Sequence, residues 1–154
     1  MTLLQGKLLS GEPDGLGEGG LMNDNTAGAR PADTMAVVVG GLRFASGISF
    51  LVAPGAANRL WGDAEEPNIT TSLLLRSMGY RDALVGGLLL ASGLRRDGDA
   101  TRWFLASAGA DGADLLGGLA NHSRMTPAQR RRGLGGAVVG IGVGLGGALW
   151  SRSR

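Results

Sequence analysis

Residues 35–53 read MAVVVGGLRFASGISFLVA, and this stretch decides the fold. It is apolar apart from one charge, Arg43, and Pro54-Gly55 ends it. At 1.5 Å per residue a helix of this length rises about 28 Å, close to the thickness of the hydrocarbon core of a bilayer. No polar stripe along it could face water. The stretch therefore predicts a transmembrane helix.

Three further apolar stretches follow it, at residues 72–94, 101–120 and 133–150. Each is long enough to span a bilayer, and short polar segments join them, so consecutive helices should be antiparallel neighbours. We therefore predict an all-α protein, an integral membrane four-helix bundle over residues 35–150. A water-soluble bundle is the alternative, but every stretch except 101–120 is apolar on all sides.

Residues 1–34 differ from the rest of the chain, because they are polar and rich in glycine. Gly11, Pro13 and Gly15 would interrupt any helix there. The segment has no apolar run of the length that a secretory signal needs. It predicts an extended tail, either solvated and flexible or ordered by docking on a partner.

The composition excludes several kinds of chemistry. The chain has no cysteine, so it has no thiol nucleophile, disulfide or thiolate-bound metal. Its one histidine, His122, cannot form a histidine cluster. The arginines are dispersed without interleaved aromatic residues, which argues against a nucleic-acid partner. We therefore expect no catalytic residues, no cofactor and no metal, and the protein is predicted not to be an enzyme.

The arginine, glycine and alanine bias is typical of a bacterial genome, and we expect a multi-pass protein of the bacterial cytoplasmic (inner) membrane. Four spans would place both termini on one side. That side carries one more arginine near the helix ends than the other side does, so the positive-inside rule favours cytoplasmic termini. The basic segment with His122, Arg124 and residues 130–132 is predicted to contact lipids, anionic ones included.

Six ionisable residues lie inside the predicted spans, and each costs about 2.5–3.5 kcal/mol if it is unpaired at mid-helix. They are Arg43, Arg76, Arg81, Asp82, Asp111 and Asp114. Most lie at similar depth, so they should form one buried charge cluster, although Arg76 can instead reach the headgroups. Two interpretations stay open: a salt-bridge network that fixes the bundle, or a polar cavity for a ligand or a proton.

The last span carries glycines at every fourth position, Gly136, Gly140 and Gly144. This pattern gives two overlapping G-x-x-x-G motifs on one helix face, where another backbone can approach closely. The face is predicted to pack either within the bundle or against another subunit.

Short motifs along the chain resemble those of a family of small four-helix bacterial membrane proteins known only as a domain of unknown function. They are Arg43 with Gly47, Ala53-Pro54-Gly55, Trp61-Gly62, Arg76-x-x-Gly79-Tyr80-Arg81-Asp82 with Gly86, and Asp111-x-x-Asp114. The resemblance covers about residues 35–150. It implies the four-helix fold and a recurring role for the Arg/Asp set, and it implies no activity.

These observations favour a small non-enzymatic accessory or structural subunit of a larger bacterial membrane protein complex. Docking would use the glycine-rich helix and the amino-terminal tail. The alternative is a ligand-binding or proton-coupled small membrane protein that uses the buried Arg/Asp cluster.

Overall fold

The computed structural model describes residues 33–60, 66–95 and 99–153, and all regular structure within these ranges is helical. The prediction of an all-α protein is confirmed. The long helices are α1 (Thr34–Val52), α3 (Ile69–Leu94), α4 (Ala100–Ala120) and α6 (Gly135–Arg152). Shorter elements are α2 (Pro54–Leu60), the 3₁₀ turn η1 (His122–Arg124), α5 (Pro127–Gln129) and the π-helical turn η2 (Arg130–Leu134). The predicted tail, except for its last two residues, and Trp61-Gly62 lie outside the described residues.

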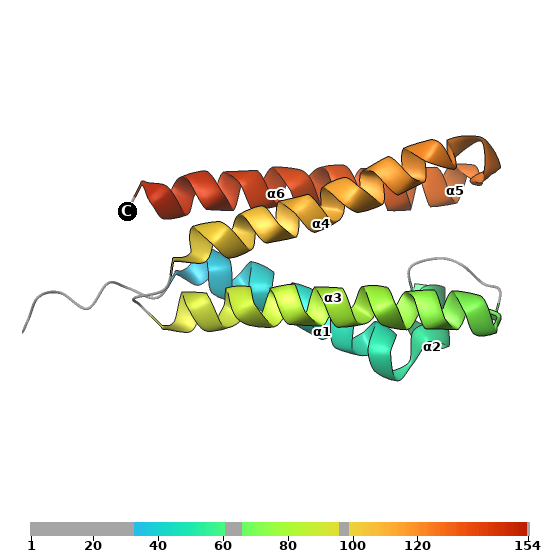
Figure 1. Cartoon of the computed structure of the whole chain (residues 1–154), viewed down its shortest axis with the longest axis horizontal. Helices are drawn as coiled ribbons and strands as arrows, with labels where there is room; N and C mark the ends of the chain where they lie inside the picture. The colour runs from blue at the N-terminus through green and yellow to red at the C-terminus, as the bar shows by residue number, and fades with distance from the viewer. Residues whose placement is uncertain (1–32, 61–65, 96–98, 154) are drawn as a thin grey trace, which may run out of the picture.

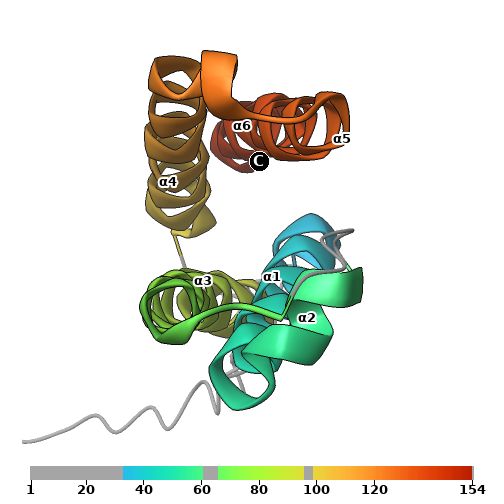
Figure 2. The same ribbon diagram turned by 90° about the vertical axis from the view of Figure 1, so that its right-hand side faces the viewer.

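The helices form two antiparallel pairs that lie one above the other (Figure 1). In one pair α1 packs along α3, with the short α2 beside them; in the other α4 packs along α6. Viewed end-on, α3 and α4 are neighbours on one side of the molecule and α1 and α6 on the other (Figure 2). The apolar core shared by the two pairs lies where α3 ends and α4 begins.

Side-chain caps decide where three of the long helices begin. The carboxylate of Asp33 accepts from the backbone N–H of Ala36 at 3.1 Å at the start of α1. Asp99 caps α4 in the same way. The amide oxygen of Asn68 accepts from Thr71 at 2.8 Å, so α3 begins at Ile69. Such caps satisfy N–H groups that have no partner inside the helix.

Two segments expected as loops are helical. The loop expected from Pro54 contains α2, because proline fits the first turn of a helix, where no N–H donor is needed. The last helical stretch begins at Pro127 and not at residue 133, because Thr126 and Gln129 form a reciprocal capping box. The basic residues 130–132 accordingly lie in the π-helical turn η2, and not in an open loop.

Two helical stretches of the described chain are long and apolar enough to cross a membrane. They are α1, Thr34–Val52, and the continuous run Pro127–Arg152 that contains α5, η2 and α6. By length and composition α3 and α4 do not qualify, and both carry charged residues at mid-helix. Long apolar side chains are exposed on the outer faces of all four long helices.

Glycines at seven-residue spacing bring α1 and α3 together. Gly40 and Gly47 of α1 face Gly86 and Gly79 of α3, and Gly93 of α3 lies against the start of α1. A Cβ atom added at any of these five glycines would lie within 3.0 Å of an atom of the facing helix. The two backbones are therefore too close for a side chain at these positions. Close backbone contact of this kind stabilises helix pairs in lipid.

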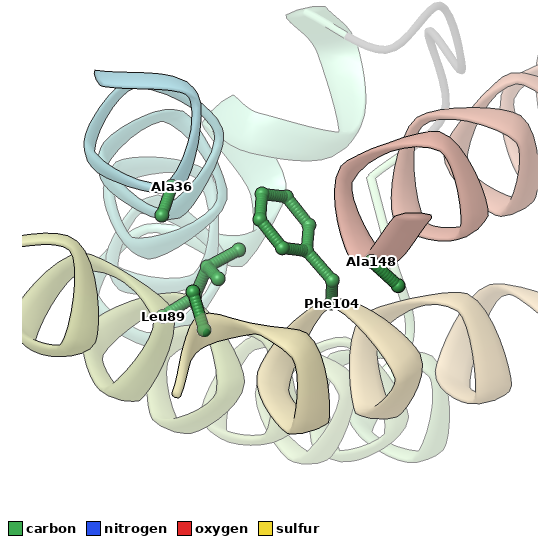
Figure 3. Close-up of a cluster of buried hydrophobic side chains, with 5 residues drawn as sticks. Ala36, Leu89, Phe104 and Ala148 are labelled. Atoms are coloured by element: carbon green, nitrogen blue, oxygen red, sulfur yellow. The ribbon is translucent and has the colours of Figure 1, made fainter. Parts of the chain in front are cut away.

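A small apolar core joins the two pairs near the α3–α4 end. Phe104 of α4 is fully buried and points toward Ala36 and Leu89 of the first pair, with Ala148 of α6 on its other side (Figure 3). Gly147 makes room for its ring, since a Cβ atom there would overlap the aromatic carbons. The core is short, so it fixes only one end of the stacked pairs.

The glycine seam predicts opposite effects for two neighbouring substitutions. Gly40→Ala should lower the free energy of unfolding by about 1–3 kcal/mol, because its methyl group overlaps the backbone of α3. Gly41→Ala, whose methyl group meets open space, should be neutral or raise it by up to about 1 kcal/mol through helix propensity. Loss of helicity on titration with a denaturing detergent measures both; equal effects would contradict the seam.

Candidate functional site: an alternating chain of aspartates and arginines

Five of the six predicted charged residues form one connected chain of ion pairs. In order along the contacts they are Asp111, Arg43, Asp82, Arg81 and Asp114. Negative and positive groups alternate, and a carboxylate stands at each end. The chain runs from α4 to α1, then to α3, and back to α4. We call this set the Arg/Asp network.

Arg43 is the centre of the network. Its two terminal nitrogens donate to both carboxylate oxygens of Asp111, each at 2.9 Å. One of them also donates to Ser107 Oγ at 2.8 Å, and the other to Asp82 Oδ1 at 2.9 Å. Paired forks of this kind are strong hydrogen bonds because both partners are charged and their geometry matches. One side chain of α1 thus holds α3 and α4 at once.

Arg81 continues the network toward the surface. It donates to Asp82 Oδ1 through Nε at 3.2 Å and through a terminal nitrogen at 3.1 Å. Its two terminal nitrogens hold the two oxygens of Asp114 at 2.8 and 2.7 Å. Asp82 therefore receives donors from both arginines on one oxygen, and it links the two guanidinium groups.

Exposure rises along the network from one end to the other. The side chains of Arg43 and Asp111 are only 13% and 12% exposed, whereas those of Arg81 and Asp114 are 32% and 41% exposed. At 1.5 Å per residue these residues lie about 14–21 Å along their helices from the α3–α4 end. The network therefore crosses the middle of the molecule from the interior to the surface.

The helix α6 closes the buried end of the network. Gly140 lies directly against the carboxylate of Asp111, and a Cβ atom at this position would overlap the Asp111 side chain. Gly144, one turn further on, packs against Ala108 of α4. Two of the three glycines predicted to form a contact face thus lie inside the molecule, and Gly140 leaves space for a buried ion.

The remaining predicted site residues lie elsewhere. Arg76 is exposed on α3 and takes no part in the Arg/Asp network. Gly136 is exposed, and a Cβ atom added to it would meet nothing within 4 Å. The sixth charge and the third glycine are therefore available to the surroundings of the protein.

Two features of the site were not predicted. Ser107 is uncharged, yet its hydroxyl oxygen accepts a hydrogen bond from Arg43. Its position one turn before Asp111, on the same helix face, was the sequence signal that could have identified it. The seven-residue spacing of Gly79, Gly86 and Gly93 was the signal for the α1–α3 seam.

The arrangement joins helices through paired charges. Asp111 and Asp114 are each held through both oxygens by a separate guanidinium, so each carboxylate ties α4 to a neighbouring helix. Among the described residues no group of three or more acidic, histidine or cysteine side chains could hold a metal ion. The Nε atom of Arg43 is buried and has no partner among the described residues.

Removal of the central guanidinium should be costly. Arg43→Gln should lower the free energy of unfolding by about 3–5 kcal/mol, because it leaves the buried Asp111 carboxylate unpaired. The double variant Arg43→Gln/Asp111→Asn should recover much of this loss, since no unpaired charge then remains. Arg76→Gln is the matched control and should change stability by less than about 0.5 kcal/mol. Equal losses for Arg43→Gln and Arg76→Gln in detergent unfolding would contradict the network's structural role.

The comparisons with known proteins point to one family. The family model described as Domain of unknown function (DUF4267) matches residues 40–149, which is well over half of the chain and includes the whole Arg/Asp network. No curated protein and no solved structure matches the sequence. The resemblance to an uncharacterised family is thereby confirmed, and the chain belongs to the family described as Domain of unknown function (DUF4267).

Proposed function

We propose that this protein is a non-enzymatic accessory subunit of a larger bacterial membrane complex. The observation that carries the proposal is the engagement of the predicted charged residues with one another. The guanidinium groups of Arg43 and Arg81 tie three helices together and occupy both oxygens of Asp111 and Asp114. Because these charges pair with one another between helices, they support a structural role for the protein.

The outer surface supports the same proposal. The outward face of α6 carries Gly135, Gly142 and Gly146, where an added Cβ atom would meet nothing within 4 Å. Exposed Val139 and Leu149 lie on the same side of that helix. Another helix could approach this face as closely as α4 approaches the opposite one.

We place all four long helices across the bacterial inner membrane, with both termini on the cytoplasmic side. The apolar α1 and the run Pro127–Arg152 support this by length and composition. The charges of α3 and α4 do not exclude these helices, because Asp82 and Asp111 are paired in the interior, where the cost of insertion is offset. Exposed apolar side chains on every long helix would then face lipid or a partner.

A ligand-binding or proton-coupled membrane protein is the second candidate, and one observation favours it. The Arg/Asp network contains three carboxylates and two guanidinium groups, so it carries one excess negative charge. On α4 no residue after Asp111 is buried, and on α3 none before Gly79 is buried, so water could reach the network from that end. A bound proton or cation would balance the charge.

Single-cysteine labelling tests the four spans, and the absence of native cysteine makes each variant unambiguous. A membrane-impermeant maleimide should label Ala56→Cys and Ser123→Cys from the periplasmic side, and Arg95→Cys and Ser153→Cys only from the cytoplasmic side. Arg95→Cys is decisive. If only α1 and the run Pro127–Arg152 crossed the membrane, position 95 would be labelled from the same side as positions 56 and 123.

Purification in mild detergent through a carboxyl-terminal tag tests the accessory role. We expect a larger membrane protein in fixed stoichiometry over repeated preparations, and a variant that lacks residues 1–32 but keeps the Asp33 cap of α1 should lose most of it while keeping its helicity. The Arg76→Gln chain serves as a purification control. A small particle free of any stoichiometric partner would contradict the accessory role and favour the second candidate, for which Asp114→Asn should abolish proton or cation uptake in vesicles.

A further inference from the structure

The two ends of the Arg/Asp network differ in what covers them. At one end the Asp111 carboxylate is buried, and Gly140 of α6 lies directly against it. At the other end Arg81 and Asp114 form an ion pair whose side chains are 32% and 41% exposed, respectively. Among the described residues no side chain of α1 or α6 is hydrogen-bonded to Asp114. The network is thus closed in the interior and open at the surface.

The network as a whole carries an unbalanced charge. Three carboxylates and two guanidinium groups leave one negative charge in excess, and Arg76 does not join the network. Each terminal carboxylate contacts one arginine, Asp111 contacting Arg43 and Asp114 contacting Arg81, and each shares that arginine with Asp82. Asp114 is the most exposed of the three carboxylates, so a positive group from outside the molecule would reach the excess charge there.

The surface around this carboxylate would accept a helix. Ala110 and Gly117 lie one turn before and one turn after Asp114 on α4, and a Cβ atom at Gly117 would meet nothing within 4 Å. On α3, Leu84 is exposed one turn after Arg81. We call this surface the α3–α4 face; its residues are Arg81, Leu84, Ala110, Asp114 and Gly117.

We propose that a transmembrane helix of the partner complex packs on the α3–α4 face and brings a lysine or arginine side chain to Asp114. This inference rests on the proposed function, and it names the chemistry of the partner. Acyl chains cannot hydrogen-bond to an exposed ion pair at mid-helix, so bare lipid would leave Arg81 and Asp114 poorly stabilised. A basic side chain supplies a further donor to Asp114 and the positive charge that the network lacks. The small residues on either side of Asp114 allow the partner's backbone to come close enough.

Site-specific photocrosslinking in native membranes tests the proposal on the full chain. A benzophenone amino acid replaces Leu84 on the α3–α4 face, and the same group at Leu149 on the outer face of α6 is the matched control. Mass spectrometry of the Leu84 product should identify a transmembrane peptide of the partner with a lysine or arginine within about two helical turns of the crosslink. Asp114→Asn should reduce the Leu84 crosslink at least tenfold and leave the Leu149 product unchanged, while Asp114→Glu should retain it.

A charge exchange completes the test. Asp114→Lys should abolish the crosslink, and replacing the partner's basic residue by aspartate should restore it in that background. The position of the basic residue in the crosslinked peptide decides the proposal even where the Asp114→Asn chain fails to fold.

The outcomes separate this inference from the proposed function. If a partner co-purifies but position 84 crosslinks only to lipid, or to a segment without a basic residue, the inference fails and the accessory role stands. If no partner co-purifies and only lipid is crosslinked, both fail. A product between two copies of this chain, or a crosslink that Asp114→Asn leaves unchanged, also overturns the inference.

Discussion

The fork between the Arg43 guanidinium and the Asp111 carboxylate is the interaction on which the rest of this structure depends. It is the contact through which α1 holds α4, and the same guanidinium reaches Asp82 on α3. A lysine could not replace it, because an ammonium group is a compact point charge without the planar array of donors that serves several acceptors at once. The short core around Phe104 and the Arg81–Asp114 pair also join the two helix pairs.

Glycine makes this electrostatic arrangement possible. Arg43 can reach two other helices because Gly40 and Gly47 let the backbone of α1 lie directly against that of α3. On the other side of the network, Gly140 leaves room for the Asp111 carboxylate beneath α6. Larger residues at these positions would separate the helices and lengthen each charged hydrogen bond. The buried charges of this chain therefore depend on its glycines, since closely packed backbones keep water and lipid away from the ions.

The sequence was sufficient for the helical class and for most members of the charge cluster, for a physical reason. Charges inside apolar stretches must find partners, so Arg43, Arg81, Asp82, Asp111 and Asp114 could be grouped by sign and depth alone. Pairing itself could not be predicted, because it depends on the rotation of each helix about its axis. Arg76 shows this: the sequence left open whether it joins the cluster or reaches the headgroups, and only the rotation of α3, which leaves Arg76 exposed, separates it from the other five residues.

The helix boundaries and the glycine contacts were predicted less well, because both depend on local chemistry that hydropathy does not register. A capping box and a proline start the last helical run at Pro127, well before the apolar residues begin. The regular spacing of glycines on α6 drew attention to Gly136, which faces open space. The seam with the closest backbone contact instead uses the sparser glycines of α1 and α3, whose period of seven is less visible in an apolar sequence.

The same period of seven explains why the seam needs the ion pairs. Gly40 and Gly47 lie opposite Gly86 and Gly79, but a shift of α3 by seven residues, about 10 Å, would place them opposite Gly93 and Gly86. Gly40 and Gly47 would each still face a glycine of α3, so backbone packing alone distinguishes the two registers poorly. In the shifted register Arg43 would face the apolar residues around Leu89, and its bond to Asp82 would be lost. The Arg81–Asp114 pair would be lost as well, so the two ion pairs that join α3 to α1 and α4 favour one register of the two that glycine packing would allow.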